Sequence, residues 1–272
     1  MWAHLNLVEE EGERNEIGSN DYVGSSSYFW RNHSTCRFFG WLMASTDISD
    51  FYNQRGGTVH ILGSGPSLFY VDGRKLERHD NIFVNAASLM MPIEAKLGNQ
   101  NMWLSVDRLC SKWSYFWESL RKKCVKLLKK DFSKYHDHLA KYQVRYFQTR
   151  KGVKIEDIYD NCLCGGSSIP AAIDAALKMG YSKILLFGVD QRFIQGKSHF
   201  WQFYPPSKRP LFTGGTNVSK TEQKKMFERN QKHFVELKKM ADKMSVEIIN
   251  CAQRTSALDV FPKVRINQGL EI

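Results

Sequence analysis

Short apolar runs alternate with helical patterns along most of the chain. The runs that are typical of buried strands occupy residues 58–62, 81–87, 102–107, 144–149, 183–190 and 246–250. Helical patterns lie between them at residues 112–139 and 168–179, and a third begins at Ser219, which forms an S-x-x-E capping box with Glu222. This alternation predicts a Rossmann-like α/β fold, with a mostly parallel sheet and helices on both of its faces.

The first part of the chain lacks this pattern. Residues 1–57 begin acidic and polar, pass through a serine-rich stretch and become rich in aromatic residues, without a regular period. We therefore expect an irregular N-terminal extension at residues 1–57, followed by one α/β domain at residues 58–272.

The composition is that of an ordinary globular protein, since 42% of the 272 residues are hydrophobic and 25% are charged. No apolar run approaches the ~18 residues of a membrane span, and the N-terminus has no apolar core of signal-peptide length. These features predict a cytoplasmic protein with reduced thiols. The C-x-C pair Cys162 and Cys164 has no second pair at zinc spacing, so we expect no structural metal.

The chain is basic, with a formal net charge of +11 and a pI of about 9.3. Such a charge favours polyanionic partners: nucleic acid, an anionic surface or a nucleotide substrate. Much of the excess lies in two lysine-rich segments at residues 121–130 and 220–239. They are either solvated helix faces or surfaces that follow phosphate groups, and the sequence leaves both interpretations open.

Polar residues follow several of the predicted strands. The sequence GSGPSL at residues 63–68 comes after the first strand, Asn85 and Asp107 end the next two, and Asp190 ends the run at 183–190. In parallel sheets the carboxyl ends of the strands share one edge, where ligands bind. Residues 63–67 are either a tight turn or a backbone nest for a phosphate. The dinucleotide fingerprint is incomplete, because Leu68 replaces its third glycine, and no G-K-[ST] of a P-loop follows.

The stretch at residues 165–193 carries a second set of polar groups. Two glycines, Ser167 and Ser168 precede a helix of small residues, and a G-V-D strand end follows it. One of the two serines is expected to cap the helix, and the functional interpretation is that both donate to the same ligand.

The order G-x-G-P-S-L, strand-ending Asn, [ST]-S before an alanine-rich helix, G-Y-x-x-I and G-[VI]-D resembles the bacterial family 42 sialyltransferases over residues 58–260. It is also similar to the Maf-type flagellin glycosyltransferases and the archaeal 6-hydroxymethylpterin pyrophosphokinases. The resemblance implies that residues 58–272 form a catalytic domain that binds a nucleotide or nucleotide sugar. The residues implied to contact this substrate are Gly63, Ser64, Gly65, Pro66, Ser67, Asn85, Asp107, Gly166, Ser167 and Ser168.

The resemblance also points to three catalytic residues. Asp190 matches the aspartate of the family's G-I-D motif, and Arg192 stands where the sialyltransferases have a tyrosine. An arginine can neutralise a departing phosphate but cannot act as an acid there. Residues 212–223 lack the family's histidine, so His199 is the best-placed histidine to accept a proton, with an ordinary loop histidine as the alternative.

We therefore expect a glycosyltransferase that moves a sugar, by analogy a CMP-activated acidic sugar, from a nucleotide donor to an acceptor hydroxyl. The acceptor would be a glycan, a glycoconjugate or a modified nucleic acid. The sequence has no D-x-D motif, so no metal or other cofactor is expected. One alternative is a pyrophosphokinase acting on a pterin, with magnesium held by Asp107 or Asp190. The other is a protein that binds or modifies nucleic acid.

Overall fold

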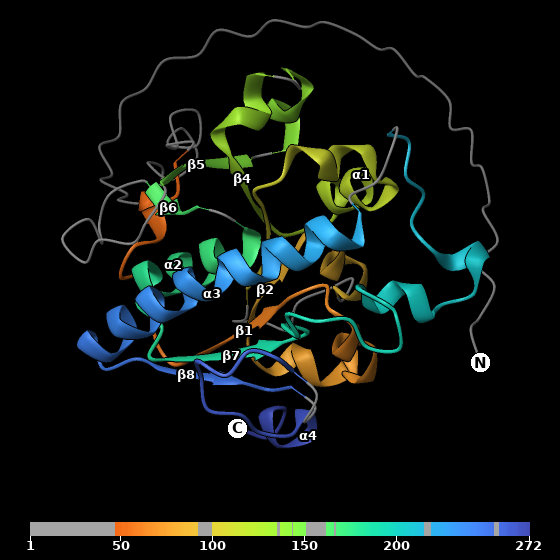
Figure 1. Cartoon of the computed structure of the whole chain (residues 1–272). Coiled ribbons are helices and arrows are strands. Elements are labelled where there is room, and N and C mark those ends of the chain that lie inside the picture. The colour runs from red at the N-terminus through yellow and green to blue at the C-terminus, as the bar shows by residue number, and fades with distance from the viewer. Residues whose placement is uncertain are drawn as a thin grey trace, which may run out of the picture. The chain divides into compact units, whose positions relative to one another are not determined.

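The computed structural model describes residues 47–91, 100–134, 137–142, 144–150, 162–165, 167–214, 219–252 and 256–272. Eight strands form one sheet in the order β6-β5-β4-β3-β2-β1-β7-β8, and every pair of neighbours is parallel (Figure 1). The predicted Rossmann-like α/β fold is therefore confirmed.

The sequence order of the elements follows a repeated strand and crossover pattern. The strands are β1 (Thr58–Leu62), β2 (Asp80–Val84), β3 (Asn101–Ser105), β4 (Val125–Lys129), β5 (Val144–Arg150), β6 (Cys162–Cys164), β7 (Lys183–Phe187) and β8 (Glu247–Asn250). The α-helices are α1 (Ser114–Arg121), α2 (Ser168–Met179), α3 (Lys220–Lys243) and α4 (Ile266–Gly269). Short 3₁₀ helices lie at Ser49–Phe51, Pro66–Tyr70, Gly73–Arg78, Asn85–Met90, Arg108–Lys112, Lys130–Lys134, Asp137–Tyr142, Phe200–Phe203 and Pro206–Lys208.

The sheet separates two apolar cores. On one face the alanines of α2 and the apolar side of α3, including Phe234 and Leu237, pack against the strands. Figure 1 shows these two helices running beside each other over the sheet. On the other face α1, α4 and several 3₁₀ helices bury Phe116, Leu68 and Phe200. Because both faces are covered, the central strands β1, β2, β3 and β7 are almost wholly buried, as parallel strands usually are.

Two of the predicted helix boundaries agree closely with the structure. Helix α2 occupies the predicted residues and ends at Gly180, whose φ of +88° suits the left-handed cap position. Helix α3 begins after Ser219, whose hydroxyl accepts the N–H of Glu222 while the Glu222 carboxylate accepts the N–H of Ser219.

The predicted helix at residues 112–139 is wrong. Within its described residues only α1 is an α-helix, and the segment continues into strand β4 and two 3₁₀ helices, Lys130–Lys134 and the start of Asp137–Tyr142. In β4, Leu127 faces the core that contains α2, and Lys126 and Leu128 alternate with it toward the opposite face. Lys126 and Lys129 give this segment a polar pattern, so the sequence did not predict a strand here. Leu127 and Leu128 are buried in the cores on opposite faces of the sheet.

The start of the domain lies earlier than the first strand. Ile48 is fully buried and Tyr52 nearly so, in the same core as α2. Residues 1–46 of the predicted extension lie outside the described residues. Within the described residues, no helix is both long and apolar enough to cross a bilayer.

Candidate functional site

The carboxyl ends of β1, β2, β3 and β7 surround a cavity of about 230 Å³. These strands are neighbours in the order β3-β2-β1-β7, so the loops that follow them meet at one edge. Predicted site residues that line the cavity are Ser64, Gly65, Pro66, Asn85, Asp107, Ser167, Ser168, Asp190, Arg192 and His199. Gly63 and Ser67 are buried beside it without lining it, and Gly166 lies outside the described residues.

The two glycines after β1 allow close contact between two loops of the chain itself. The Gly65 N–H donates to the Gly188 carbonyl over 2.8 Å, and a Cβ on Gly65 would lie 2.5 Å from Asp190 Oδ2. A Cβ on Gly63 would lie 2.6 Å from the Gly188 carbonyl oxygen. The sequence left open a tight turn or a phosphate nest at these glycines, and in the structure they allow the loop after β1 to pack against the loop after β7.

Asp190 joins the same two loops through its carboxylate. Its Oδ2 accepts the backbone N–H of Ser67 over 2.9 Å, and its Oδ1 is buried without a hydrogen-bond partner. Burial raises the pKa of Asp190, while the Ser67 hydrogen bonds and the charge of Arg192 act in the opposite direction. The carboxylate therefore holds the loop after β1 in place.

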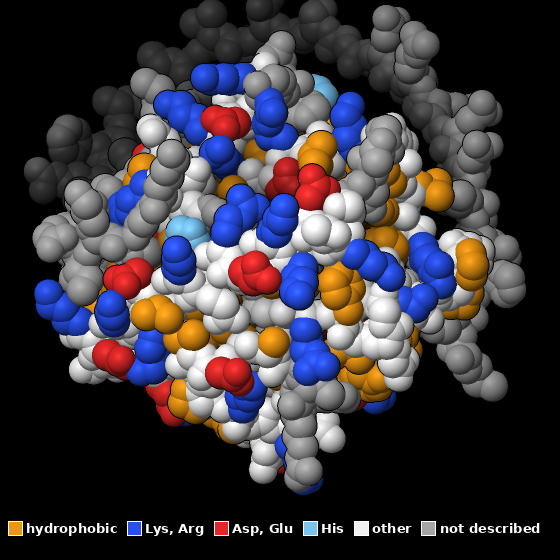
Figure 2. Space-filling model, viewed as in Figure 1, with side chains coloured by type: hydrophobic (Ala, Val, Ile, Leu, Met, Phe, Trp, Pro, Cys, Tyr) orange, Lys and Arg blue, Asp and Glu red, His pale blue; other side chains and the backbone are white. Residues whose placement is uncertain are grey.

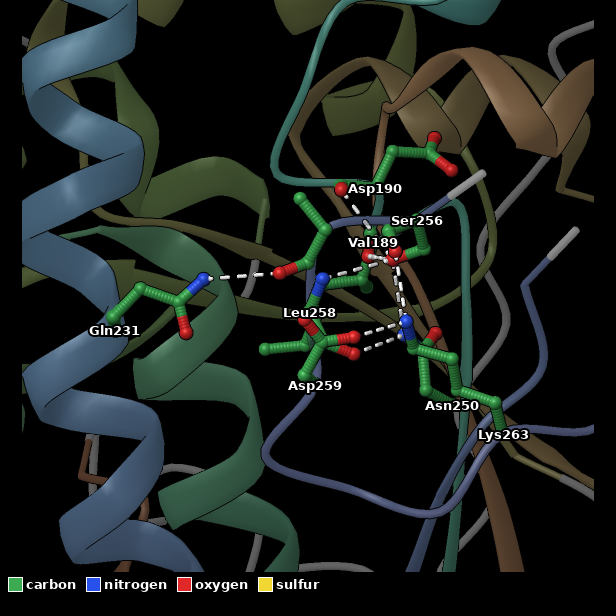
Figure 3. Close-up of polar contacts among 9 residues, drawn as sticks. Val189, Asp190, Gln231, Asn250, Ser256, Leu258, Asp259 and Lys263 are labelled. Carbon is green, nitrogen blue, oxygen red and sulfur yellow. Dashed lines mark hydrogen bonds and ion pairs between the residues drawn. The ribbon is translucent and has the colours of Figure 1, made fainter. Parts of the chain in front are cut away.

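The loop that contains Ser256 and Ala257 holds the backbone of Asp190 through hydrogen bonds. The Ser256 hydroxyl lies 3.2 Å from the Val189 carbonyl oxygen and 3.3 Å from that of Asp190, and Asn250 Nδ2 donates to the same hydroxyl. The Ala257 N–H also donates to the Asp190 carbonyl over 2.9 Å. Figure 3 shows these contacts, with the Asp190 side chain pointing away from Ser256. No motif in the sequence indicated this support.

Asn85 is oriented by donors on one side of its amide. Its Oδ1 lies 2.9 Å from Ser105 Oγ, 3.3 Å from Ser168 Oγ and 3.4 Å from Cys110 Sγ. Its φ of +51° falls in the left-handed region, which asparagine tolerates better than most residues. These contacts use Oδ1 alone, and Asn85 lines the cavity.

The two serines before α2 have different roles. Ser168 accepts the N–H of Val106 over 3.2 Å and thereby ties the helix to the end of β3. Ser167 occupies the cap position but makes no capping bond, and its Oγ is buried without a partner. The first N–H groups of the helix thus face the cavity edge without a side-chain cap.

His199 is held beside the loop after β1. Its Nδ1 lies 3.3 Å from Ser64 Oγ, and its ring stacks on Trp201 with a centroid distance of 5.4 Å. Burial lowers the pKa of His199 to about 4, although a hydrogen bond with the Ser64 backbone acts in the opposite direction. The imidazole is therefore neutral near pH 7.

Two charged residues lie at more open positions. Arg192 is exposed and lines the cavity just after Gln191, whose φ is +52°. Asp107 is also exposed and caps a 3₁₀ helix, with its Oδ1 accepting the N–H of Leu109 over 2.9 Å. The cavity thus has a cation and an anion at its accessible edge.

An aromatic wall, which the sequence analysis did not predict, closes another side of the cavity. We use this name for Trp113, Trp201 and Phe212, which line it together. The Trp113 ring centroid lies 5.2 Å from that of Trp201 and 4.7 Å from that of Phe212. Nearby, burial and the Cys110 thiol raise the pKa of Tyr115, which keeps its hydroxyl protonated. The three residues of the aromatic wall come from loops and 3₁₀ helices, which carry no strong periodic pattern.

The described residues contain no cluster of three or more His, Cys, Asp or Glu side chains arranged to hold a metal ion. Cys162 and Cys164 are separated by one residue in β6, so their side chains lie on the same face of the sheet. Cys164 instead lies 3.3 Å from His233 Nδ1, and burial raises its pKa to about 12.

Comparison with known proteins gives a distant likeness. The chain matches no protein-family model and no curated protein sequence. Among solved structures it is similar to the sialyltransferase CstII from Campylobacter jejuni, determined in complex with a substrate analogue, cytidine-5'-monophosphate. The two are 14% identical, with a TM-score of 0.39, over 75% of this chain and 83% of that chain. The likeness is one of fold.

Proposed function

We propose that the chain is a glycosyltransferase that binds a nucleotide-activated sugar in the cavity and transfers the sugar to an acceptor hydroxyl. The observation that carries the proposal is the convergence of three kinds of group on one cavity. These are anion-binding donors at the start of α2 and on Asn85, a cation on Arg192 and a neutral histidine at position 199.

The anion-binding groups suit the phosphate of the donor. The uncapped N–H groups at the start of α2 carry a partial positive charge, and Asn85 Nδ2 adds a neutral donor. Arg192 can reach this region from the open edge of the cavity because its side chain is exposed. Together these groups stabilise negative charge as it develops on the departing phosphate.

His199 suits the role of general base. With the proton on Nδ1 directed to Ser64, the lone pair of Nε2 is available to the acceptor. The acceptor hydroxyl gives its proton to Nε2 while its oxygen forms a bond to the anomeric carbon. The bond from that carbon to the phosphate oxygen breaks, and the nucleotide leaves with the electron pair. Asp190 acts in this scheme as a positioning residue, because its carboxylate holds Ser67.

The size and shape of the cavity limit how the donor binds. A volume of about 230 Å³ lies below the range of pockets that enclose whole drug-sized ligands, about 300–1,000 Å³. We therefore expect the cavity to enclose the sugar and its phosphate, with the remaining part of the nucleotide at the open edge. The aromatic wall offers flat apolar surface to a sugar or a base.

The experiment is an assay of nucleotide release from CMP-, UDP- and GDP-sugars, with and without EDTA. The wild-type protein should release one nucleotide in a metal-independent reaction, and His199→Gln should slow the release by at least about 10²-fold. A matched control is His138→Gln, at a histidine that stacks on Trp117 outside the cavity.

The proposal fails if well-folded protein turns over none of these donors. The alternative of pyrophosphoryl transfer predicts a different result, namely magnesium-dependent release of AMP from ATP in the presence of a pterin alcohol. These assays share no product, so they separate the two reactions.

A further inference from the structure

A second hollow lies at the opposite edge of the sheet from the cavity. Its volume is about 720 Å³, and its lining comes from residues that precede or begin β3 and β4 and from residues that precede β5. Because all the strands are parallel, these residues lie at the amino ends of the strands, whereas the cavity lies at the carboxyl ends. The hollow is therefore a separate site, and we call it the basic hollow.

The charges around the basic hollow have one sign. It is lined by Arg121, Lys122, Lys123, Lys126 and Lys141, and no described acidic residue lines it. Glu118 lies near enough to raise the pKa of Lys122 but is not part of the lining. By contrast, Figure 2 shows Lys and Arg mixed with Asp and Glu on the face that α3 covers.

Two of these cations have structural roles. Lys122 Nζ donates to the Ser88 carbonyl over 2.6 Å, and burial lowers the pKa of Lys122. Arg121 ends α1, where a positive charge is favoured by the helix dipole. These roles explain why the two positions are basic, but they do not account for the remaining lysines.

Lys126 is the decisive residue. It is only 8% exposed, and among the described residues it forms neither a hydrogen bond nor an ion pair. Its position in β4 directs the side chain to the same face as the buried Leu128, and it lines the hollow. Its ammonium nitrogen is not among the fully buried polar atoms, so the stem of the side chain is buried while the charged end opens to the hollow. An anion bound in the hollow would supply the missing partner.

Neutral donors add to these charges. Asn101 is 4% exposed and lines the hollow, and its Oδ1 accepts Asn81 Nδ2 over 3.0 Å, which leaves its own Nδ2 to donate. Tyr142 also lines the hollow, with Lys141 Nζ 5.1 Å from its ring centroid. Amide and ammonium donors around an open hollow suit phosphate oxygens.

We infer that the basic hollow binds a phosphate-bearing polyanion, supplied either by a nucleic-acid strand or by a free polyphosphate. The site is independent of the proposed transferase activity, since the two sites share no lining residue.

The test uses the full chain with two probes, a fluorescent single-stranded DNA of about 20 nucleotides and inorganic tripolyphosphate. The double variant Arg121→Glu/Lys123→Glu should weaken the binding of both probes at least about tenfold. It should also reduce, by about 1 to 2, the steepness with which the logarithm of the binding constant falls against the logarithm of the salt concentration. The matched control Lys224→Glu/Lys232→Glu makes the same charge change at exposed positions of α3. It should weaken binding by less than about twofold.

A third variant separates binding from folding. Lys126→Met removes the charge and keeps an unbranched side chain of similar length that can fill the same buried space, so the melting temperature should be unchanged or higher while binding is weaker. Tight binding of tripolyphosphate that displaces the DNA identifies a free polyphosphate as the source. Binding of DNA that tripolyphosphate does not displace identifies a strand. Equal losses in both double variants, or no binding of either probe at about 50 mM salt, would overturn the inference.

Discussion

The Ser67 backbone N–H donates to Asp190 Oδ2 over 2.9 Å and links turns that lie 123 residues apart in the sequence. This bond joins the loops after β1 and β7, two neighbouring strands whose ends border the cavity. Its geometry depends on the absence of side chains at Gly63, Gly65 and Gly188, where the loops touch.

Gly65→Ala should destabilise the protein by about 1–3 kcal/mol and weaken ligand binding in the cavity. The added Cβ would lie 2.5 Å from both Asp190 Oδ2 and the Gly188 carbonyl oxygen, so one of the loops must move. Thermal melting and nucleotide titration measure the two effects. Gly56→Ala is the matched control, because no atom lies within 4 Å of its added Cβ. Equal melting temperatures for the two variants would contradict the packing argument.

Asn85→Asp should preserve the fold and weaken the binding of an anionic ligand by at least about tenfold. An aspartate keeps an oxygen for Ser105, Ser168 and Cys110, and it tolerates the positive φ. It replaces the Nδ2 donor by a negatively charged oxygen that repels phosphate. Ser105→Ala, which removes one partner of Oδ1 but keeps Nδ2, should reduce affinity far less, as measured by calorimetric titration. Similar losses in the two variants would argue against Nδ2 as a ligand donor.

The pH dependence of turnover tests the assignment of His199. Because burial lowers its pKa to about 4, the base is deprotonated from about pH 5 upward. We expect kcat/KM to rise with pH through about 4 and to stay level from about pH 5 to 7. The pH profile of His199→Gln should lack this acid limb. An acid limb near the ordinary histidine value of about 6.5 would show that another group, or an exposed His199, controls the rate.

A second histidine governs stability. His60 is fully buried in β1, with Nδ1 3.2 Å from Asn81 Oδ1 and Nε2 without a partner, and burial lowers its pKa to about 3. Below the unfolded value of 6.5 the unfolded chain takes up a proton that the folded chain does not. The free energy of unfolding should therefore fall as the pH drops from about 6.5 toward 3 and be level above that range.

Denaturant titrations at two pH values measure this effect. Between about pH 7 and 5, His60→Gln should lose roughly 2 kcal/mol less stability than the wild-type protein loses. The glutamine amide can still donate to Asn81, so the variant tests the charge and not only the packing. An identical pH dependence in the two proteins would mean that His60 is not the group responsible.

The sequence predicted that the polar residues after the strands would lie close together. This prediction needs only the order of strands and loops, because the carboxyl ends of parallel strands lie at one edge of the sheet. Asn85, Ser168 and Asp190 come from different segments, and the structure brings them to one cavity. Their roles toward a ligand stay a prediction. The glycines after β1 were also visible, but their local pattern did not show that the neighbouring contact would be the loop at Gly188.

The parts that could not be predicted lack a regular period. The aromatic wall comes from short 3₁₀ helices and loops, where no spacing shows which side chains will face one another. The sequence did not predict strand β4, because a buried parallel strand is expected to be apolar throughout and this one has lysines at positions 126 and 129. Ser256 holds Asp190 through backbone carbonyls, and such contacts depend on the position of the chain and leave little trace in the sequence.

The most direct test of the account is a crystal structure of the protein soaked with a mixture of CMP, UMP, GMP and AMP. We expect one nucleotide in the cavity, with its phosphate near the start of α2, Asn85 and Arg192. A nucleotide bound only elsewhere on the protein, or an empty cavity that is open to solvent in the crystal, would contradict it.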